Sequence, residues 1–98
     1  MIEIDHEDLY RRALAAYGMD YQLTVAVEEL IELQKEICKL IRCEGNVTNL
    51  IEEMADVYII LAELKQFFAI GNDETDAIIR QKQIRLAQRI SAKYEGLV

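Results

Sequence analysis

The stretch Thr48–Ile70, TNLIEEMADVYIILAELKQFFAI, decides the fold of this chain. It contains no proline or glycine, and Asn49 with Glu52 near its start has the spacing of a helix capping box. At about 100° per residue, its apolar side chains cover nearly the whole circumference of a helix. A helix that is apolar all round must be buried, so we expect it at a bundle centre or a subunit interface.

Glycines divide the rest of the chain into three further helical segments. These are expected at about Asp5–Tyr17, at about Asp20–Cys43, and from Asn72 or Asp73 towards Gly96. Short connections favour antiparallel neighbours, and no strand-like alternation or internal repeat is visible. We therefore predict a single all-α domain over residues 1–98, with a four-helix bundle-like protomer.

The composition favours assembly with other copies of the chain. Hydrophobic residues make up 52% of the 98 residues, which is more apolar material than a small monomer easily hides. We expect a homodimer or homotetramer. The formal net charge of −7 disfavours nucleic acid and anionic membrane partners. No signal peptide or membrane span is apparent, and the two cysteines suit a reducing compartment, so a cytoplasmic location is expected.

Two acidic pairs lie in consecutive predicted helices. Glu29 and Glu32 are three residues apart in the second helix, and Glu53 and Asp56 have the same spacing in the third. This spacing places both members of a pair on one helix face, one turn apart. Antiparallel packing would bring the four carboxylates together, and such a cluster repels itself unless a cation lies within it. An all-oxygen site of this kind suits Mg²⁺ or Mn²⁺.

Each pair also has a simpler interpretation. The first pair lies opposite the main apolar stripe of its helix, so periodicity alone favours solvated surface charges there. Glu53 and Asp56 project into the same arc as Ile60 on a helix expected to be buried. Charged groups rarely enter such a face without a partner or a metal, which favours a functional role for the second pair. An ordinary buried ion pair remains the alternative.

The two pairs and their interval resemble the signature of the MazG-like all-α nucleoside triphosphate pyrophosphohydrolases. This superfamily also includes dimeric all-α dUTPases and phosphoribosyl-ATP pyrophosphohydrolases. The resemblance covers roughly residues 20–93. It implies catalytic Mg²⁺ ligation by Glu29, Glu32, Glu53 and Asp56. It also implies hydrolysis between the α- and β-phosphates of a nucleotide, a small-molecule substrate, to give a monophosphate and pyrophosphate.

The fourth predicted helix is basic. Five of the 11 basic residues lie between Arg80 and Lys93, and no acidic residue occurs from Ala77 to Tyr94. One interpretation is a solvated face that offsets acidic neighbours. The other is a grip on the departing phosphates, and Lys82 and Arg85 resemble the phosphate-binding positions of the family's last helix. Leu86 stands where many relatives have asparagine, which puts the exact substrate in doubt.

Three functions fit these observations. The first is a Mg²⁺-dependent nucleotide pyrophosphohydrolase. The second is a catalytically silent acidic helical module that binds a protein partner, in which the carboxylates of the second helix point into water. The third is a phosphoribosyl-ATP pyrophosphohydrolase, which performs the same chemistry on another substrate.

Overall fold

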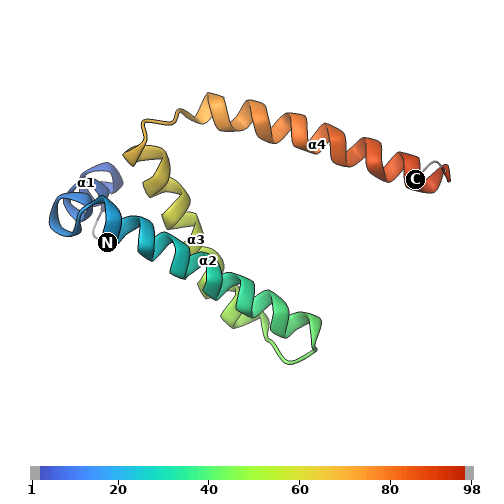
Figure 1. The fold of residues 1–98 in the computed structure, drawn as a ribbon, viewed down its shortest axis with the longest axis horizontal. Coiled ribbons are helices and arrows are strands. Elements are labelled where there is room, and N and C mark those ends of the chain that lie inside the picture. Colours follow the sequence, from blue (N-terminus) through green and yellow to red (C-terminus); the bar gives the residue numbers. More distant parts are fainter. Residues whose placement is uncertain (1–2, 97–98) are drawn as a thin grey trace.

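Four α-helices and no strand make up residues 3–96, the part of the chain that this computed structural model describes (Figure 1). They are α1 (His6–Tyr17), α2 (Met19–Ile41), α3 (Val47–Phe67) and α4 (Asn72–Tyr94). The all-α prediction is therefore confirmed. No helix among the described residues is long and apolar enough to cross a membrane.

Local capping chemistry explains where the helices begin. The Asp5 side chain caps α1 by accepting a 3.1 Å hydrogen bond from the backbone N–H of Asp8. Asn46 caps α3 in the same way, through a 2.8 Å bond from the N–H of Asn49. The third helix consequently starts before Thr48, where the sequence had suggested its beginning. Gly18 separates α1 from α2 with a φ of 84°, which favours glycine because it lacks a Cβ.

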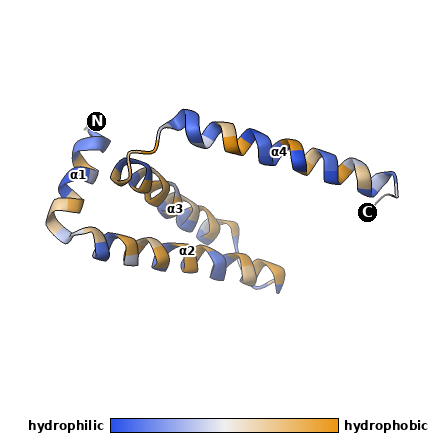
Figure 2. Ribbon diagram, turned by 45° about the horizontal axis from the view of Figure 1, so that its top comes forward, coloured by the Kyte–Doolittle hydropathy of each residue, from blue (hydrophilic) through white to orange (hydrophobic). Residues whose placement is uncertain are grey.

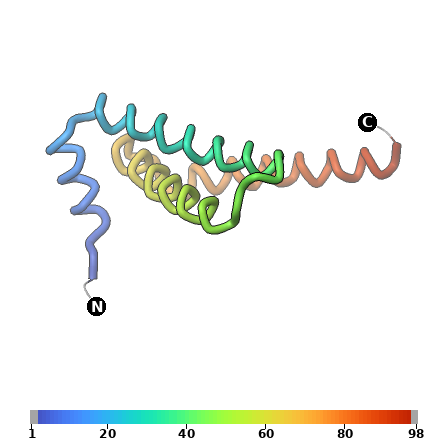
Figure 3. The backbone as a smooth tube through the Cα atoms, turned by 90° about the horizontal axis from the view of Figure 1, so that it is seen from below, coloured from blue at the N-terminus to red at the C-terminus, as the bar shows by residue number. Residues whose placement is uncertain are grey.

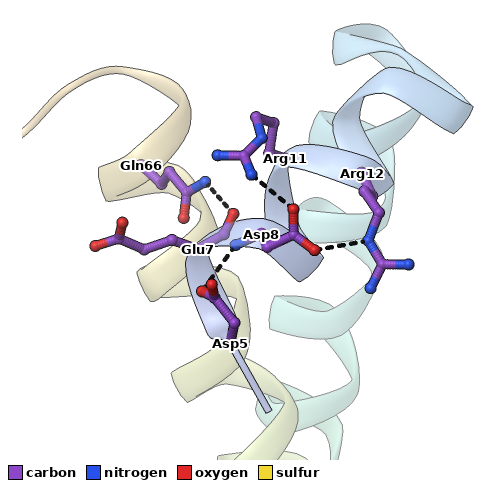
Figure 4. Close-up of polar contacts among 6 residues, drawn as sticks. All are labelled: Asp5, Glu7, Asp8, Arg11, Arg12 and Gln66. Carbon is purple, nitrogen blue, oxygen red and sulfur yellow. Dashed lines mark hydrogen bonds and ion pairs between the residues drawn. The ribbon is translucent and has the colours of Figure 1, made fainter.

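Helices α2 and α3 form an antiparallel hairpin, and α1 packs across one end of it (Figures 1 and 3). Gln66 near the end of α3 ties α1 in place, since its side-chain amide donates a 2.8 Å hydrogen bond to the carbonyl oxygen of Glu7 (Figure 4). Asp8 forms ion pairs with Arg11 and Arg12 on the surface of α1. These three helices position the acidic pairs.

The fourth helix departs from the predicted bundle. Apart from a 3.0 Å hydrogen bond between Lys65 and Asn72 at the junction, α4 leads away from the hairpin and packs against none of the other helices within residues 3–96 (Figures 1 and 3). The connection turns at Ala69, whose φ of 53° is left-handed. The prediction of a four-helix bundle-like protomer is therefore wrong for a single copy, in which only three helices pack together.

A single copy has almost no interior. Ala26 and Ile60 are its only buried hydrophobic residues among those described, and each is still 5% exposed. The exposed surface is 8139 Å², against about 5,700 Å² expected for a folded monomer of 11.3 kDa. The radius of gyration is 17.6 Å, whereas a compact chain of this length has about 13 Å. Figure 2 shows apolar segments along α2 and α3 and at intervals on α4. The burial expected for α3 is thus not achieved within one copy.

Candidate metal centre

The side of α2 that faces α3 carries both acidic and apolar residues, and part of the main apolar stripe of the helix is exposed. Gln22, Ala26 and Glu36 are the buried residues of α2, and Glu29 is half-buried on the same helix face. Leu30 and Ile41, which belong to the main apolar stripe, are exposed. Of the pair interpreted as solvated surface charges, Glu32 is exposed, whereas Glu29 is half-buried and meets two carboxylates of α3. The apolar stripe of α2, which the sequence pattern favoured as the core-facing side, is partly exposed to solvent in a single copy.

Three of the four predicted ligands meet between the helices. A carboxylate oxygen from each of Glu29, Glu53 and Asp56 lies within 4.8 Å of the other two. Glu29 comes from α2, while Glu53 and Asp56 come from successive turns of α3. The antiparallel hairpin holds them together because the two faces that carry the acidic pairs are turned toward each other.

The pKa values of two of these groups are raised, first by burial and then by the neighbouring carboxylates. Burial raises the pKa of Glu29 above its ordinary value of 4.5, and the neighbouring Asp56 raises it further. Desolvation likewise raises the pKa of Glu53, followed by the charge of Asp56. Neighbouring carboxylates thus oppose one another's ionisation, and a cation among them would relieve that repulsion.

Glu32 does not join this cluster. It is exposed, and its carboxylate is not one of the three that converge. It is still close enough for its negative charge to raise the pKa of both Glu29 and Glu53. Glu32 therefore lies at the edge of the centre, and the structure brings together three of the four residues that the sequence pattern selected.

Glu36 belongs to the acidic surroundings of the centre, although the sequence pattern did not single it out. Its side chain is only 6% exposed and forms a 3.1 Å ion pair with Lys39. Its second carboxylate oxygen, Oε1, is buried without a hydrogen-bond partner. Its charge also raises the pKa of Glu53. Its position, one turn beyond Glu32 on the same side of α2, was the available signal.

The predicted phosphate-binding residues lie elsewhere in a single copy. Lys82 and Arg85 are exposed on α4, which does not pack against the helices that carry the acidic centre. Lys82 instead lines an open cleft of about 870 Å³ between the later part of α3 and the start of α4. One chain alone therefore does not bring the basic and acidic residues together.

The residues of the centre suit a divalent cation that prefers oxygen ligands. Three carboxylates converge from two rigid helices, and the described residues place no basic side chain in hydrogen-bond contact with any of them. Mg²⁺ and Mn²⁺ both prefer carboxylate oxygens, and Mg²⁺ usually keeps some of its water ligands. Glu29, Glu53 and Asp56 could hold such an ion, with Glu32 at the edge.

Comparisons with known proteins add no relative. No protein family, curated protein or solved structure matches this chain. Any functional conclusion therefore depends on the residues and their geometry.

Proposed function

We propose that this protein is a Mg²⁺-dependent nucleotide pyrophosphohydrolase that works as a homo-oligomer in the cytoplasm. The observation that carries the proposal is the convergence of Glu29, Glu53 and Asp56 within 4.8 Å of one another. The spacing of the two acidic pairs supports it independently, because it resembles the MazG-like signature. The proposed reaction is cleavage between the α- and β-phosphates of a nucleoside triphosphate.

The carboxylates would have two tasks in this reaction. They would hold the cation from one side and leave its remaining positions open to water and phosphate oxygens. The bound ion would neutralise phosphate charge and lower the pKa of a coordinated water. Glu32, exposed at the edge of the centre, could accept a proton from a water molecule there. An anionic substrate could then approach a chain of net charge −7.

The silent-module alternative differs in how it would treat the acidic pairs. That alternative leaves the carboxylates of the second helix pointing into water. Glu29 does not, since it is half-buried and meets the α3 pair. This position favours the enzyme. The identity of the base and sugar is a separate matter that a substrate panel would resolve, with phosphoribosyl-ATP included.

The test is pyrophosphate release from a panel of nucleoside triphosphates, measured with and without Mg²⁺. Glu53→Gln and Asp56→Asn keep the side-chain shape and remove the charge, so each should abolish release. Each should also abolish the rise in melting temperature that Mg²⁺ causes in the wild type, because a ligand bound only by the folded state stabilises it. The metal-free variants should be at least as stable as the parent.

Glu28→Gln provides the matched control. Glu28 is adjacent to Glu29 on α2 and exposed, and it is not one of the three converging carboxylates. It should retain both activity and the Mg²⁺ shift. If millimolar Mg²⁺ leaves the melting curve of the wild type unchanged and no nucleotide is cleaved, the metal-centre proposal is wrong and the interaction module is the better explanation.

A further inference from the structure

A second cleft lies where α1, the end of α3 and the start of α4 come together. Its volume is about 500 Å³, which is within the range of small-molecule sites. The first turns of α1, the last turns of α3 and the connection to α4 form its walls. Its polar and aromatic lining includes His6, Tyr10, Arg11, Lys65, Gln66 and Asn72.

This cleft is separate from the acidic centre. Lys65 is nine residues beyond Asp56 on α3, which corresponds to about 14 Å along the helix and to two and a half turns about its axis. Lys65 therefore lies on the opposite side of α3 from Asp56. None of the three converging carboxylates lines the cleft. A ligand in the cleft would not share the cation of the acidic centre.

Two helices bring positive charge to the cleft. Lys65 of α3 is half-buried, and its ammonium donates a 3.0 Å hydrogen bond to the side-chain oxygen of Asn72. No acidic side chain within residues 3–96 forms an ion pair with it. Arg11 of α1 donates to Asp8 at 2.6 Å (Figure 4). An ammonium has three N–H donors and a guanidinium has five, so most of these donors are left for a ligand.

A neutral donor and an aromatic wall complete the lining. Gln66 donates one amide N–H to the carbonyl oxygen of Glu7 at 2.8 Å, and its amide carries a second N–H. The rings of His6 and Tyr10 have centroids 6.3 Å apart and planes inclined by 31°. Glu7 is the one acidic residue among the described residues that line the cleft. Two cationic side chains thus face one carboxylate, in a chain whose net charge is −7.

We propose that this cleft binds a small organic phosphate, which Arg11 and Lys65 hold by its phosphate group. A phosphate has three strong acceptor oxygens, so it can accept hydrogen bonds from donors on two helices at once. The organic part packs against the rings of His6 and Tyr10, which offer an apolar surface. The site does not depend on the proposed function, because neither a metal ion nor a carboxylate of the acidic centre takes part.

A ligand in the cleft would connect three parts of the fold. The Gln66–Glu7 hydrogen bond links α3 to α1, and the Lys65–Asn72 bond links α3 to α4. Side chains from both bonds line the cleft. Binding should therefore raise the melting temperature of the chain, since a ligand that the folded state alone binds stabilises that state. It should also shift the backbone amide signals of α1 and of Asn72 together.

The test is calorimetric and NMR titration of the full chain in EDTA. The probes are adenosine monophosphate, ribose 5-phosphate, inorganic phosphate and adenosine. EDTA removes divalent cations, so the acidic centre cannot take up phosphate through a metal ion. Saturable binding is expected for the two phosphate esters, with weaker binding of inorganic phosphate and none of adenosine. Equal affinity for inorganic phosphate, or binding of adenosine as tight as that of its monophosphate, would overturn the proposal.

Variants locate the binding in the cleft. Lys65→Met and Arg11→Met keep most of the side-chain volume and remove the charge, so each should weaken binding roughly 10-fold or more. Arg12→Met is the matched control, since Arg12 pairs with the same Asp8, at 3.1 Å, and does not line the cleft. Its affinity should equal that of the wild type. Arg11 is exposed, so Arg11→Met decides the question even if loss of the Lys65–Asn72 bond destabilises the other variant.

The outcomes separate this proposal from the proposed function. Absence of saturable binding, unchanged affinity in Arg11→Met, or equal weakening in Arg12→Met would refute the cleft, whether or not the chain releases pyrophosphate. A chain that cleaves no nucleotide but binds the phosphate esters through Arg11 supports the cleft and refutes the proposed function.

Discussion

Tyr58→Ala measures how much of the proposed assembly depends on the apolar side of the hairpin, where Leu30 and Ile41 of α2 and Met54, Tyr58 and Leu61 of α3 are exposed. Tyr58 lies between Met54 and Leu61 on the exposed apolar side of α3 and is 69% exposed in a single copy. Buried aromatic side chains cover about 150–250 Å², so roughly 140 Å² of Tyr58 is available to a partner. At about 25 cal/mol per Å², its burial contributes up to ~3.5 kcal/mol per copy.

A symmetric dimer contains this contact twice, which gives an upper bound of ~7 kcal/mol. The tyrosine hydroxyl is polar and alanine retains part of the contact, so about half of this bound is expected. We therefore predict that Tyr58→Ala raises the dissociation constant of the dimer several hundred-fold, which corresponds to ~3.5 kcal/mol. At concentrations above its dissociation constant, the assembled variant should have the helical content of the wild type, because Tyr58 contributes little to the interior of a single copy.

Sedimentation velocity over nanomolar to micromolar concentrations measures this change. Tyr21→Ala is the matched control, since Tyr21 is also exposed but stacks on Tyr17, with ring centroids 4.9 Å apart, away from the apolar side of the hairpin. Its assembly should match that of the wild type. The reasoning would be refuted by a Tyr58→Ala dimer as tight as the wild type, or by equal weakening in both variants.

Two further predictions concern the charged groups. Burial and neighbouring carboxylates raise the pKa of Glu29 and Glu53 above 4.5, so the folded state binds their protons more tightly than the unfolded state does. Their contribution to the free energy of unfolding is therefore fully present below pH ~4.5 and is lost as the pH rises through the folded-state pKa. In EDTA, the melting temperature of Glu53→Gln minus that of the wild type should grow from pH 4.5 to pH 7, and a constant difference would contradict the repulsion. Separately, Lys82→Ala and Arg85→Ala should each lower kcat/KM by roughly 10–150-fold, the cost of one charge-assisted phosphate contact, with helicity intact. Arg80→Ala should leave the kinetics unchanged, because Arg80 lies outside the arc that Lys82, Arg85, Arg89 and Lys93 share on the same helix. Unaltered kinetics in all three variants would mean that the basic residues of α4 form a solvated face.

Local chemistry made the helices predictable from the sequence. Gly18, Gly45 and Gly71 interrupt the helical pattern locally, so the breaks near these positions could be located to within a few residues, although the cap of α3 is Asn46 and not the Asn49–Glu52 pair. The pairing of Glu53 with Asp56 was equally local, since the helical repeat alone places them together. Their meeting with Glu29 required in addition that α2 turn its Glu29 side toward α3, which periodicity did not predict.

Only the tertiary structure decided which side of each helix meets which neighbour. Periodicity identifies the residues that share a face, but it does not say whether an apolar face is covered by the same chain or by another. For α2 the usual assumption failed, because Glu29 and Glu36 face α3 while Leu30 and Ile41 are open. The direction of α4 could not be predicted from the sequence for the same reason. It depends on the turn at Ala69 and on apolar surface that a single chain does not cover.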